Sequence, residues 1–356
     1  MTDRSELWWR EVTGPRSFIE GIAAEILGNK SVALRSGIGL PWRGVLRDML
    51  MEQIRRRGQD DLYLEYLAPE PGDDPAETLL RNYGPVDVRN GYRVASGQKL
   101  NEYMLEKGAL SSLIVWVKVS GNAKPWLDFA RNWNAKSLSD GLLILEAGPS
   151  LPAVPGKRVT VMEYDKYIDK YDILLFSGII AAERRGYNIS EKLYVSNLAA
   201  ALCEGDAEAA AARIDGGDLL NADPAESGLA GTAGASAPHR VWEAQIQTIF
   251  PLLELSRRAF IEKHRAPLED ALEYFRSAEG ALKQFDVEVT SADDLELGTI
   301  FWIMRRRKAD NPAEYVCYIP AETERERIGL LHRMRNALAH CGPCDAADVR
   351  KFLAEA

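Results

Sequence analysis

The chain has 356 residues, of which 46% are hydrophobic and 27% are charged, which is typical of a soluble protein long enough for two domains. The net charge of −9 excludes a protein that binds nucleic acid through its overall charge, because phosphate binding would then require a local basic patch. No segment has the length of a membrane span, and the N-terminus lacks the apolar core of a signal peptide, so we expect a cytoplasmic protein.

The first part of the chain has the pattern of a strand, a glycine-rich loop and a helix. A helix is predicted over residues 15–27. Residues 31–34 form a short, mostly apolar segment with a β-branched valine, which predicts a strand. This segment leads directly into the loop at residues 35–44, and an amphipathic helix at residues 45–57 follows. In this arrangement, backbone N–H groups and a helix N-terminus can bind phosphate groups.

The loop carries the candidate cofactor-binding residues Gly37, Gly39, Arg43 and Gly44. It lacks the lysine and the hydroxyl residue that a P-loop places on the terminal phosphates and on magnesium, because valine and leucine follow Gly44. We therefore do not expect ATP hydrolysis. Two alternatives stay open for the loop: residual nucleotide binding, with Arg35 and Arg43 contacting the phosphates, or a purely structural or partner-binding role without a cofactor.

Three further apolar segments predict strands of a buried parallel sheet. They cover residues 113–118, 141–146 and 157–163, and continuous apolar runs are typical of strands that are covered on both faces. The second segment ends in Glu146, the kind of acid that a nucleotide-hydrolysing site requires, whereas the first ends in Lys118. Strands that alternate with helices at these spacings predict an α/β fold with a doubly wound, mostly parallel sheet.

This order of elements resembles the ATPase core of AAA+ and STAND proteins. By that resemblance, the helical segments at residues 164–182 and 190–214 would form the lid that follows the core. The resemblance implies a degenerate P-loop NTPase-like domain over residues 1–215. Residues 216–238 are rich in Gly, Ala, Ser and Pro, a composition that predicts a flexible linker.

The remaining residues, 239–356, predict an all-α helical bundle. Helices are expected at residues 239–264, 267–285 and 293–307. The basic run at residues 305–308 is a candidate phosphate-binding patch. The alternative is a solvated helix end, whose cations suit the helix dipole.

The last long helix, predicted over residues 323–340, has two distinct faces. Apolar residues at three- and four-residue steps form one face: Ile328, Leu331, Met334 and Leu338. Polar residues at four-residue steps form the opposite face: His332, Asn336 and His340. Arg335 lies about 140° from His340 around the helix, but its long side chain can swing toward the polar face.

Residues 335–340, Arg-Asn-Ala-Leu-Ala-His, match the RNxxxH form of the signature of HEPN domains. These are small helical bundles found in RNA-cutting toxins, CRISPR-associated ribonucleases and phage-defence proteins. Residues 242–264 and 293–307 resemble the long first helix and the middle helix of bacterial HEPN domains. The resemblance covers about a third of the chain.

The resemblance to HEPN domains implies a metal-independent endoribonuclease site. The implied roles are His340 as general acid or base for the 2′-hydroxyl or the leaving oxygen, Arg335 as stabiliser of the phosphorane charge, and Asn336 as the residue that positions them. The chemistry agrees, because imidazole titrates near neutrality and a guanidinium complements the extra negative charge of phosphoryl transfer. One motif supplies one such set, so the resemblance also implies a homodimer through the C-terminal bundle and RNA as the ligand.

Two functions stay open. The first is a HEPN ribonuclease regulated by the NTPase-like domain. By family analogy, such a ribonuclease would act in antiviral defence against phage or as a toxin. The second is a non-catalytic scaffold or adaptor in a defence complex, with both domains used to bind protein partners.

Cys341 and Cys344 form the sequence Cys-Gly-Pro-Cys, which is also the thioredoxin motif. In thioredoxin the motif follows a strand and opens a helix, whereas here it follows a predicted helix. We interpret it as the end of that helix, closed by Gly342 and Pro343. A zinc site built from both thiols and His340 would need a fourth ligand, and no metal site is predicted.

Overall fold

A computed structural model gives the fold of the chain. The described residues are 3–93, 97–149, 157–221, 237–284 and 286–355. The chain forms two compact units. Unit 1 consists of Met1–Phe176 and Gly205–Ala209, and unit 2 consists of Ser177–Glu204 and Ala210–Ala356.

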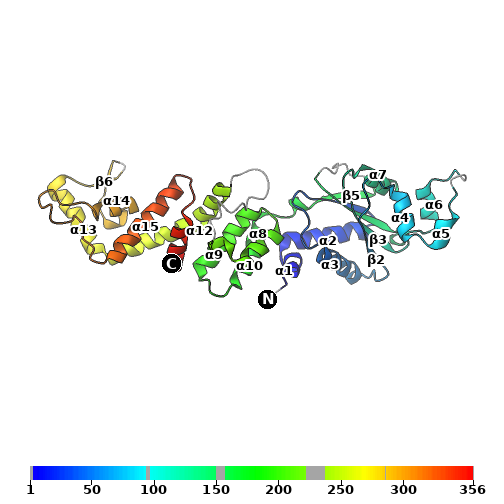
Figure 1. The fold of residues 1–356 in the computed structure, drawn as a ribbon, viewed down its shortest axis with the longest axis horizontal. Coiled ribbons are helices and arrows are strands. Elements are labelled where there is room, and N and C mark those ends of the chain that lie inside the picture. Colours follow the sequence, from blue (N-terminus) through cyan, green and yellow to red (C-terminus); the bar gives the residue numbers. More distant parts are fainter. Residues whose placement is uncertain (1–2, 94–96, 150–156, 222–236, 285, 356) are drawn as a thin grey trace. The chain divides into compact units, whose positions relative to one another are not determined.

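The described part of unit 1 is built on a five-stranded parallel sheet with the strand order β2-β3-β4-β1-β5 (Figure 1). The strands are β1 (Ser31–Arg35), β2 (Tyr63–Leu67), β3 (Leu113–Lys118), β4 (Leu142–Ala147) and β5 (Val159–Glu163). β3 and β4 are almost completely buried, because their runs of Leu, Ile and Val suit strands covered on both faces. The carboxyl ends of parallel strands meet at one edge, where the loops of such sheets form binding sites.

Helices cover both faces of the sheet. In chain order they are α1 (Arg4–Glu6), η1 (Leu7–Glu11), α2 (Thr13–Leu27), α3 (Arg43–Arg56), α4 (Pro75–Tyr83), α5 (Val86–Gly91), α6 (Leu100–Glu106), α7 (Lys124–Asn132), η3 (Leu138–Asp140) and η4 (Tyr164–Lys166). α2 and α3 pack together on one face, and α4 and α7 pack together on the other (Figure 1). The loop between β1 and α3 begins at the carboxyl end of β1, so it lies at the carboxyl edge of the sheet.

An aromatic cluster forms part of the core of unit 1. Its five side chains are at most 1% exposed: Trp8, Trp9, Phe18, Tyr164 and Phe176. The Trp8 indole N–H donates to the Tyr164 hydroxyl at 3.0 Å, and the Trp9 indole N–H donates to the Pro41 carbonyl at 3.1 Å. Because a buried indole N–H requires an acceptor, the second bond attaches the glycine-rich loop to this core.

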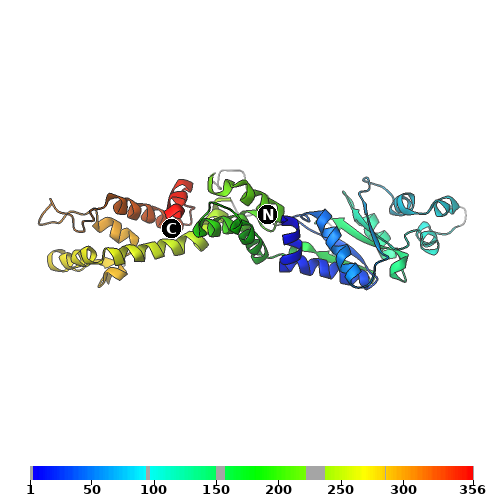
Figure 2. The same cartoon turned by 90° about the horizontal axis from the view of Figure 1, so that it is seen from below.

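Unit 2 consists mainly of helices. They are α8 (Lys170–Ala182), α9 (Ile189–Cys203), α10 (Ala207–Gly216), α11 (Asp218–Asn221), α12 (Ala237–Lys263), α13 (Arg265–Tyr274), η5 (Phe275–Glu279), η6 (Ala292–Asp294), α14 (Leu297–Ile303), α15 (Glu322–Ala339) and α16 (Ala346–Glu355). The first residues of α8 and α10 belong to unit 1. A two-stranded antiparallel hairpin pairs β6 (Lys283–Gln284) with β7 (Val287–Glu288). The 27 residues of α12 span about 40 Å, and α9 and α15 pack along this helix (Figure 2).

The predicted fold class is confirmed as a parallel sheet with flanking helices followed by a helical region. β1, β3, β4 and β5 are the four predicted strands. β2 is absent from the predicted strands, because Tyr63 and Tyr66 are exposed at the sheet edge and the segment lacks a continuous apolar run. The helix predicted over residues 267–285 ends early, because Gly280 at φ 85° leads into the β6–β7 hairpin.

The predicted lid helices divide between the two units. Residues 190–214 form two helices, α9 and α10, because Glu204 and Gly205 adopt positive φ angles of 47° and 105°. α9 packs against α12 and belongs to unit 2. The predicted first domain, 1–215, thus extends beyond the main part of unit 1, and residues 222–236 of the predicted linker lie outside the described residues.

Candidate functional site

The RNxxxH residues lie in the last turns of α15, whose apolar face is as predicted. Ile328, Leu331, Met334 and Leu338 are at most 1% exposed. The helix ends where Cys341 adopts a φ of 58° and the N–H of Gly342 donates to the Ala337 carbonyl at 3.0 Å. This geometry closes the helix by a left-handed turn, as expected for the end of a helix.

Arg335 pairs with an acid of another helix. Its Nη2 lies 3.2 Å from Glu296 Oε2, and the two side chains are 33% and 42% exposed. Glu296 is the residue that precedes α14. An exposed pair of this kind contributes only about 0.5 kcal/mol, so a phosphate can replace Glu296 at little cost.

The surroundings of Arg335 are acidic. A small cavity of about 200 Å³ at this position is lined by Asp293, Asp294 and Glu296 and also by Arg257. The Arg257 guanidinium is already bonded to Glu254 at 2.8 Å and to the Leu295 carbonyl at 2.8 Å. A phosphate that reaches Arg335 must therefore approach from the solvent side of this cavity.

Asn336 contacts a histidine of the preceding turn. The Asn336 amide nitrogen, Nδ2, lies 3.0 Å from His332 Nε2, and the His332 ring stacks on Phe301 at 4.8 Å between centroids and 20° between planes. An amide NH₂ only donates, so this contact requires His332 to accept through Nε2 and to carry its proton on Nδ1. Burial lowers the pKa of His332, and the charges of Arg335 and Arg333 lower it further.

Acidification is expected to destabilise the fold in part through His332. Its folded pKa lies below that of the unfolded chain, about 6.5, so its contribution is fully present above that pH and is lost as the pH falls through the folded pKa. Thermal unfolding followed from neutral pH to about pH 5 should show a smaller loss of Tm in His332→Phe than in the wild type. His239→Phe, at an exposed histidine, is the control; equal losses in the wild type and His332→Phe would contradict the prediction.

His340 lies at the end of α15 with its side chain exposed. Within the described part of the chain, its imidazole has no hydrogen bond, ion pair or ring contact. It lies about 140° around the helix from Arg335, and Arg335 is turned to Glu296. The structure thus brings Asn336 to His332, but it does not bring Arg335 and His340 together within one chain.

The glycine-rich loop is bonded to carboxylates of its own chain. The Gly37 N–H donates to Asp165 Oδ2 at 2.7 Å, and the Ser36 hydroxyl donates to Asp165 Oδ1 at 2.9 Å. The Trp42 N–H, directly before α3, donates to Glu208. Gly39 has a φ of 87°, a conformation that requires glycine. Two amides of the kind that bind phosphate are therefore already satisfied.

Arg43, the first residue of α3, pairs with Glu146 at the end of β4. The distance from Arg43 Nε to Glu146 Oε1 is 2.6 Å, and the Trp116 indole N–H donates to Glu146 Oε2 at 2.9 Å. The adjoining cavity, bordered also by Lys118, has a volume of about 210 Å³. This is below the roughly 300–1,000 Å³ of small-molecule sites. The space around Gly44 is open, since a Cβ there would meet no atom within 4 Å.

Some contacts at both sites have no signal in the sequence. The partners of the loop and of Arg335 are Asp165, Glu208 and Glu296, which lie 128, 166 and 39 positions from the groups they bind. Each lies close in sequence to other acids, and nothing in its local pattern distinguishes it from a solvated one. Only the tertiary fold identifies these residues.

The Cys-Gly-Pro-Cys segment has the features of a helix end. Cys344 is buried, its thiol donates to the Met334 carbonyl at 3.4 Å, and burial raises the pKa of this thiol to about 12. Cys341 is exposed. Because the thiolate is the reactive form, a redox pair with one buried, protonated member is disfavoured. Among the described residues, no group of three His, Cys, Asp or Glu side chains is placed to hold a metal ion.

Iodoacetamide at neutral pH is expected to modify Cys341 and to leave Cys344 and Cys317 unmodified. The first thiol is exposed, whereas burial raises the pKa of each of the other two to about 12. Peptide mass spectrometry of the native protein measures the labelling at each position. Labelling after denaturation should reach all three, and equal native labelling of Cys341 and Cys344 would contradict the assignment.

None of the described helices combines the length and the apolar character needed to cross a membrane. The fold is a parallel α/β unit followed by a helical unit, and the helical unit carries an Arg-Asn-x-x-x-His segment that ends in an exposed histidine. The chain matches no protein-family model and no curated protein.

Proposed function

We propose that this protein is a metal-independent endoribonuclease of the HEPN type, in which Arg335, Asn336 and His340 form the catalytic set. The observation that carries the proposal is the accessibility of the His340 side chain. Its imidazole is exposed and has no protein partner among the described residues, although it lies on the same helix end as Arg335 and Asn336. An accessible imidazole can accept a proton on one ring nitrogen and donate one from the other, so it is suited to proton transfer to or from RNA.

The reaction needs no metal in this proposal. A base removes the proton of the 2′-hydroxyl, the 2′-oxygen attacks the adjacent phosphorus, and the bond to the 5′-oxygen breaks as an acid protonates the leaving oxygen. The products are a 2′,3′-cyclic phosphate and a 5′-hydroxyl. His340 supplies one proton-transfer group, and Arg335 stabilises the charge of the phosphorane once it has exchanged Glu296 for the phosphate.

A second copy of the chain completes the site. Arg335 and His340 of one α15 point to different sides of the helix, about 140° apart, and each copy supplies one imidazole for a reaction that uses an acid and a base. Two α15 helix ends that face each other would place the Arg335 of one copy near the His340 of the other. Dimerisation through unit 2 follows as part of the proposal, and control of that pairing is the role proposed for unit 1 in phage defence or toxin activity.

Incubation of the purified protein with total RNA in excess EDTA tests the proposed function. Cleavage in EDTA that yields cyclic phosphate and 5′-hydroxyl ends is the expected result. Cleavage that requires a divalent metal, or no cleavage by a protein shown to be dimeric, would reject a metal-independent nuclease.

The geometry of unit 1 favours a second candidate, a scaffold or adaptor without catalysis. The loop amides of Gly37 and Trp42 are held by Asp165 and Glu208, and Glu146 is neutralised by Arg43. These contacts support a nucleotide-binding fold that now serves to bind protein partners. A protein that assembles with partners and leaves RNA intact in the EDTA assay would identify this second function.

A further inference from the structure

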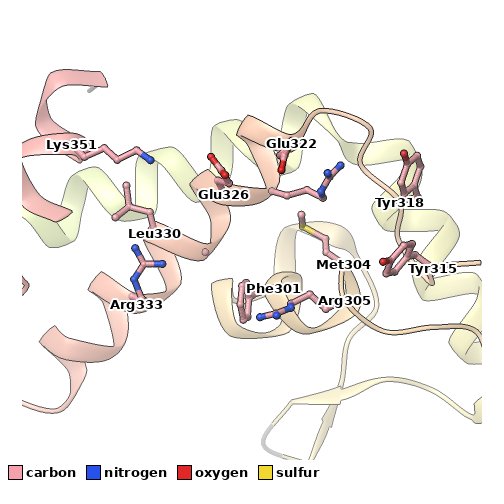
Figure 3. Close-up of a pocket in the computed structure, with 12 residues that line it drawn as sticks. Phe301, Met304, Arg305, Tyr315, Tyr318, Glu322, Glu326, Leu330, Arg333 and Lys351 are labelled. Carbon is pink, nitrogen blue, oxygen red and sulfur yellow. The ribbon is translucent and has the colours of Figure 1, made fainter. Parts of the chain in front are cut away.

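A wide groove lies in unit 2, on the side of α15 opposite the apolar face formed by Ile328, Leu331, Met334 and Leu338. Its volume is about 930 Å³, and it is lined by α14, the segment that carries Tyr315 and Tyr318, α15 and α16 (Figure 3). From α15 it is lined by Gly329 and Arg333, among others. On the helix, His340 continues the line of these two residues, about 10 Å beyond Arg333.

Cations predominate in the groove although the chain as a whole is acidic. Four cationic side chains line it, Arg305, Arg325, Arg333 and Lys351, against two acidic ones. Arg325 donates to the carbonyls of Ile319 and Pro320 at 2.6 and 2.8 Å, and Arg333 is bonded to Asp348. In the described part of the chain, neither Arg305, Arg325 nor Lys351 pairs with a carboxylate, so their charges are available to an anion.

Flat aromatic surfaces lie beside these cations. Tyr318 is 59% exposed, and its ring is nearly parallel to that of Tyr315, with 6.2 Å between centroids and 17° between planes. The Arg307 guanidinium lies 3.6 Å from the Tyr315 centroid, and that of Arg305 lies 4.9 Å from the Phe301 centroid. In Figure 3, the two tyrosines lie at one end of the groove and Lys351 and Arg333 at the other.

We propose that this groove binds single-stranded nucleic acid. Exposed aromatic rings beside cations are the combination that such strands require, because bases stack on the rings while phosphates contact the cations. A duplex hides its bases from the tyrosines, and an acidic peptide would use the cations without any need for parallel rings. A strand that follows the groove along α15 is directed past Arg333 to His340. The proposal concerns binding, and it holds whether or not the chain cleaves the strand.

Fluorescence anisotropy of a labelled oligouridine with the full-length protein tests the groove. Tyr318→Ala should weaken binding about tenfold or more through loss of stacking, and Lys351→Ala should lower the salt dependence, log K against log salt, by about 0.7 for one phosphate contact. Tyr171→Ala and Lys136→Ala, at exposed positions of unit 1, should bind as the wild type. Unchanged thermal unfolding confirms that the variants are folded.

Three outcomes would overturn the proposal. The first is wild-type affinity in both Tyr318→Ala and Lys351→Ala. The second is equal affinity for the oligouridine and its duplex with oligoadenosine. The third is displacement of the oligouridine by a polyglutamate peptide whose own affinity is unaffected by Tyr318→Ala, which would assign the groove to acidic peptides. Binding that persists in His340→Ala, or in a wild-type protein that cleaves nothing, supports the groove and leaves the nuclease proposal to its own assay.

Discussion

The His340→Ala variant is expected to lose RNA cleavage by roughly 10²–10⁴-fold, the usual contribution of a general acid or base, with no change in Tm. The imidazole is exposed and has no hydrogen bond, ion pair or ring contact with another described residue, so its removal breaks no such interaction of the fold. Cleavage of RNA in EDTA and thermal unfolding of the same preparations measure the two effects. Arg335→Ala should also lose cleavage, and it should lose only about 0.5 kcal/mol of stability with its exposed ion pair.

His239→Ala is the matched control, because His239 is a half-exposed histidine of the same unit that pairs with Glu243. It should cleave as the wild type. Full activity in both His340→Ala and Arg335→Ala would end the nuclease proposal. A fall in Tm of His340→Ala would show that the residue has a structural partner, for example in a dimer.

The Glu146→Ala variant is expected to lose about 2 kcal/mol of the free energy of unfolding. Glu146 is 8% exposed and accepts from Trp116 and Arg43 at 2.9 and 2.6 Å. Its removal leaves a buried indole N–H without an acceptor and a guanidinium without its partner. Because Arg43 is 39% exposed, water compensates part of that loss, which places the effect below the 3–5 kcal/mol or so of a fully buried pair.

Urea unfolding followed by tryptophan fluorescence measures this effect. Glu163→Ala is the control, since Glu163 ends β5, which β1 separates from β4, and forms more exposed pairs with Arg35 at 3.9 Å and Lys166 at 3.0 Å; it should lose less than about 1 kcal/mol. The double variant Glu146→Ala/Arg43→Ala should lose less free energy of unfolding than the sum of the losses in the two single variants. Equal stabilities of Glu146→Ala and the wild type would show that the carboxylate is not part of the core of unit 1.

Periodicity and composition predict the parts of this fold whose signals are local. The continuous apolar runs identify β3 and β4, and the three- and four-residue steps identify the buried face of α15. The edge strand β2 has no such run, because Tyr63 and Tyr66 are exposed. The break between α9 and α10 depends on the backbone of Glu204 as much as on Gly205.

The candidate sites are less predictable than the fold, because their partners are distant in sequence. The spacing of Arg335, Asn336 and His340 gives their angular positions on α15. It does not give the ion pair of Arg335 with Glu296, nor the groove formed where α14 and α16 meet α15. Likewise, the glycines predict a loop that can bind phosphate, but the bond of Gly37 to Asp165 depends on the position of η4 after β5.

The hydrogen bond from Gly37 to Asp165 affects how an anion can bind to the glycine-rich loop. A side chain fixed beside the loop competes at an effective concentration of at least millimolar order, so inorganic phosphate at lower concentrations remains largely excluded. We expect displacement to require a ligand with several charged groups that reaches the Gly37 and Trp42 amides in one binding event. Such a loop would select polyphosphates over simple anions by the number of charged groups they present.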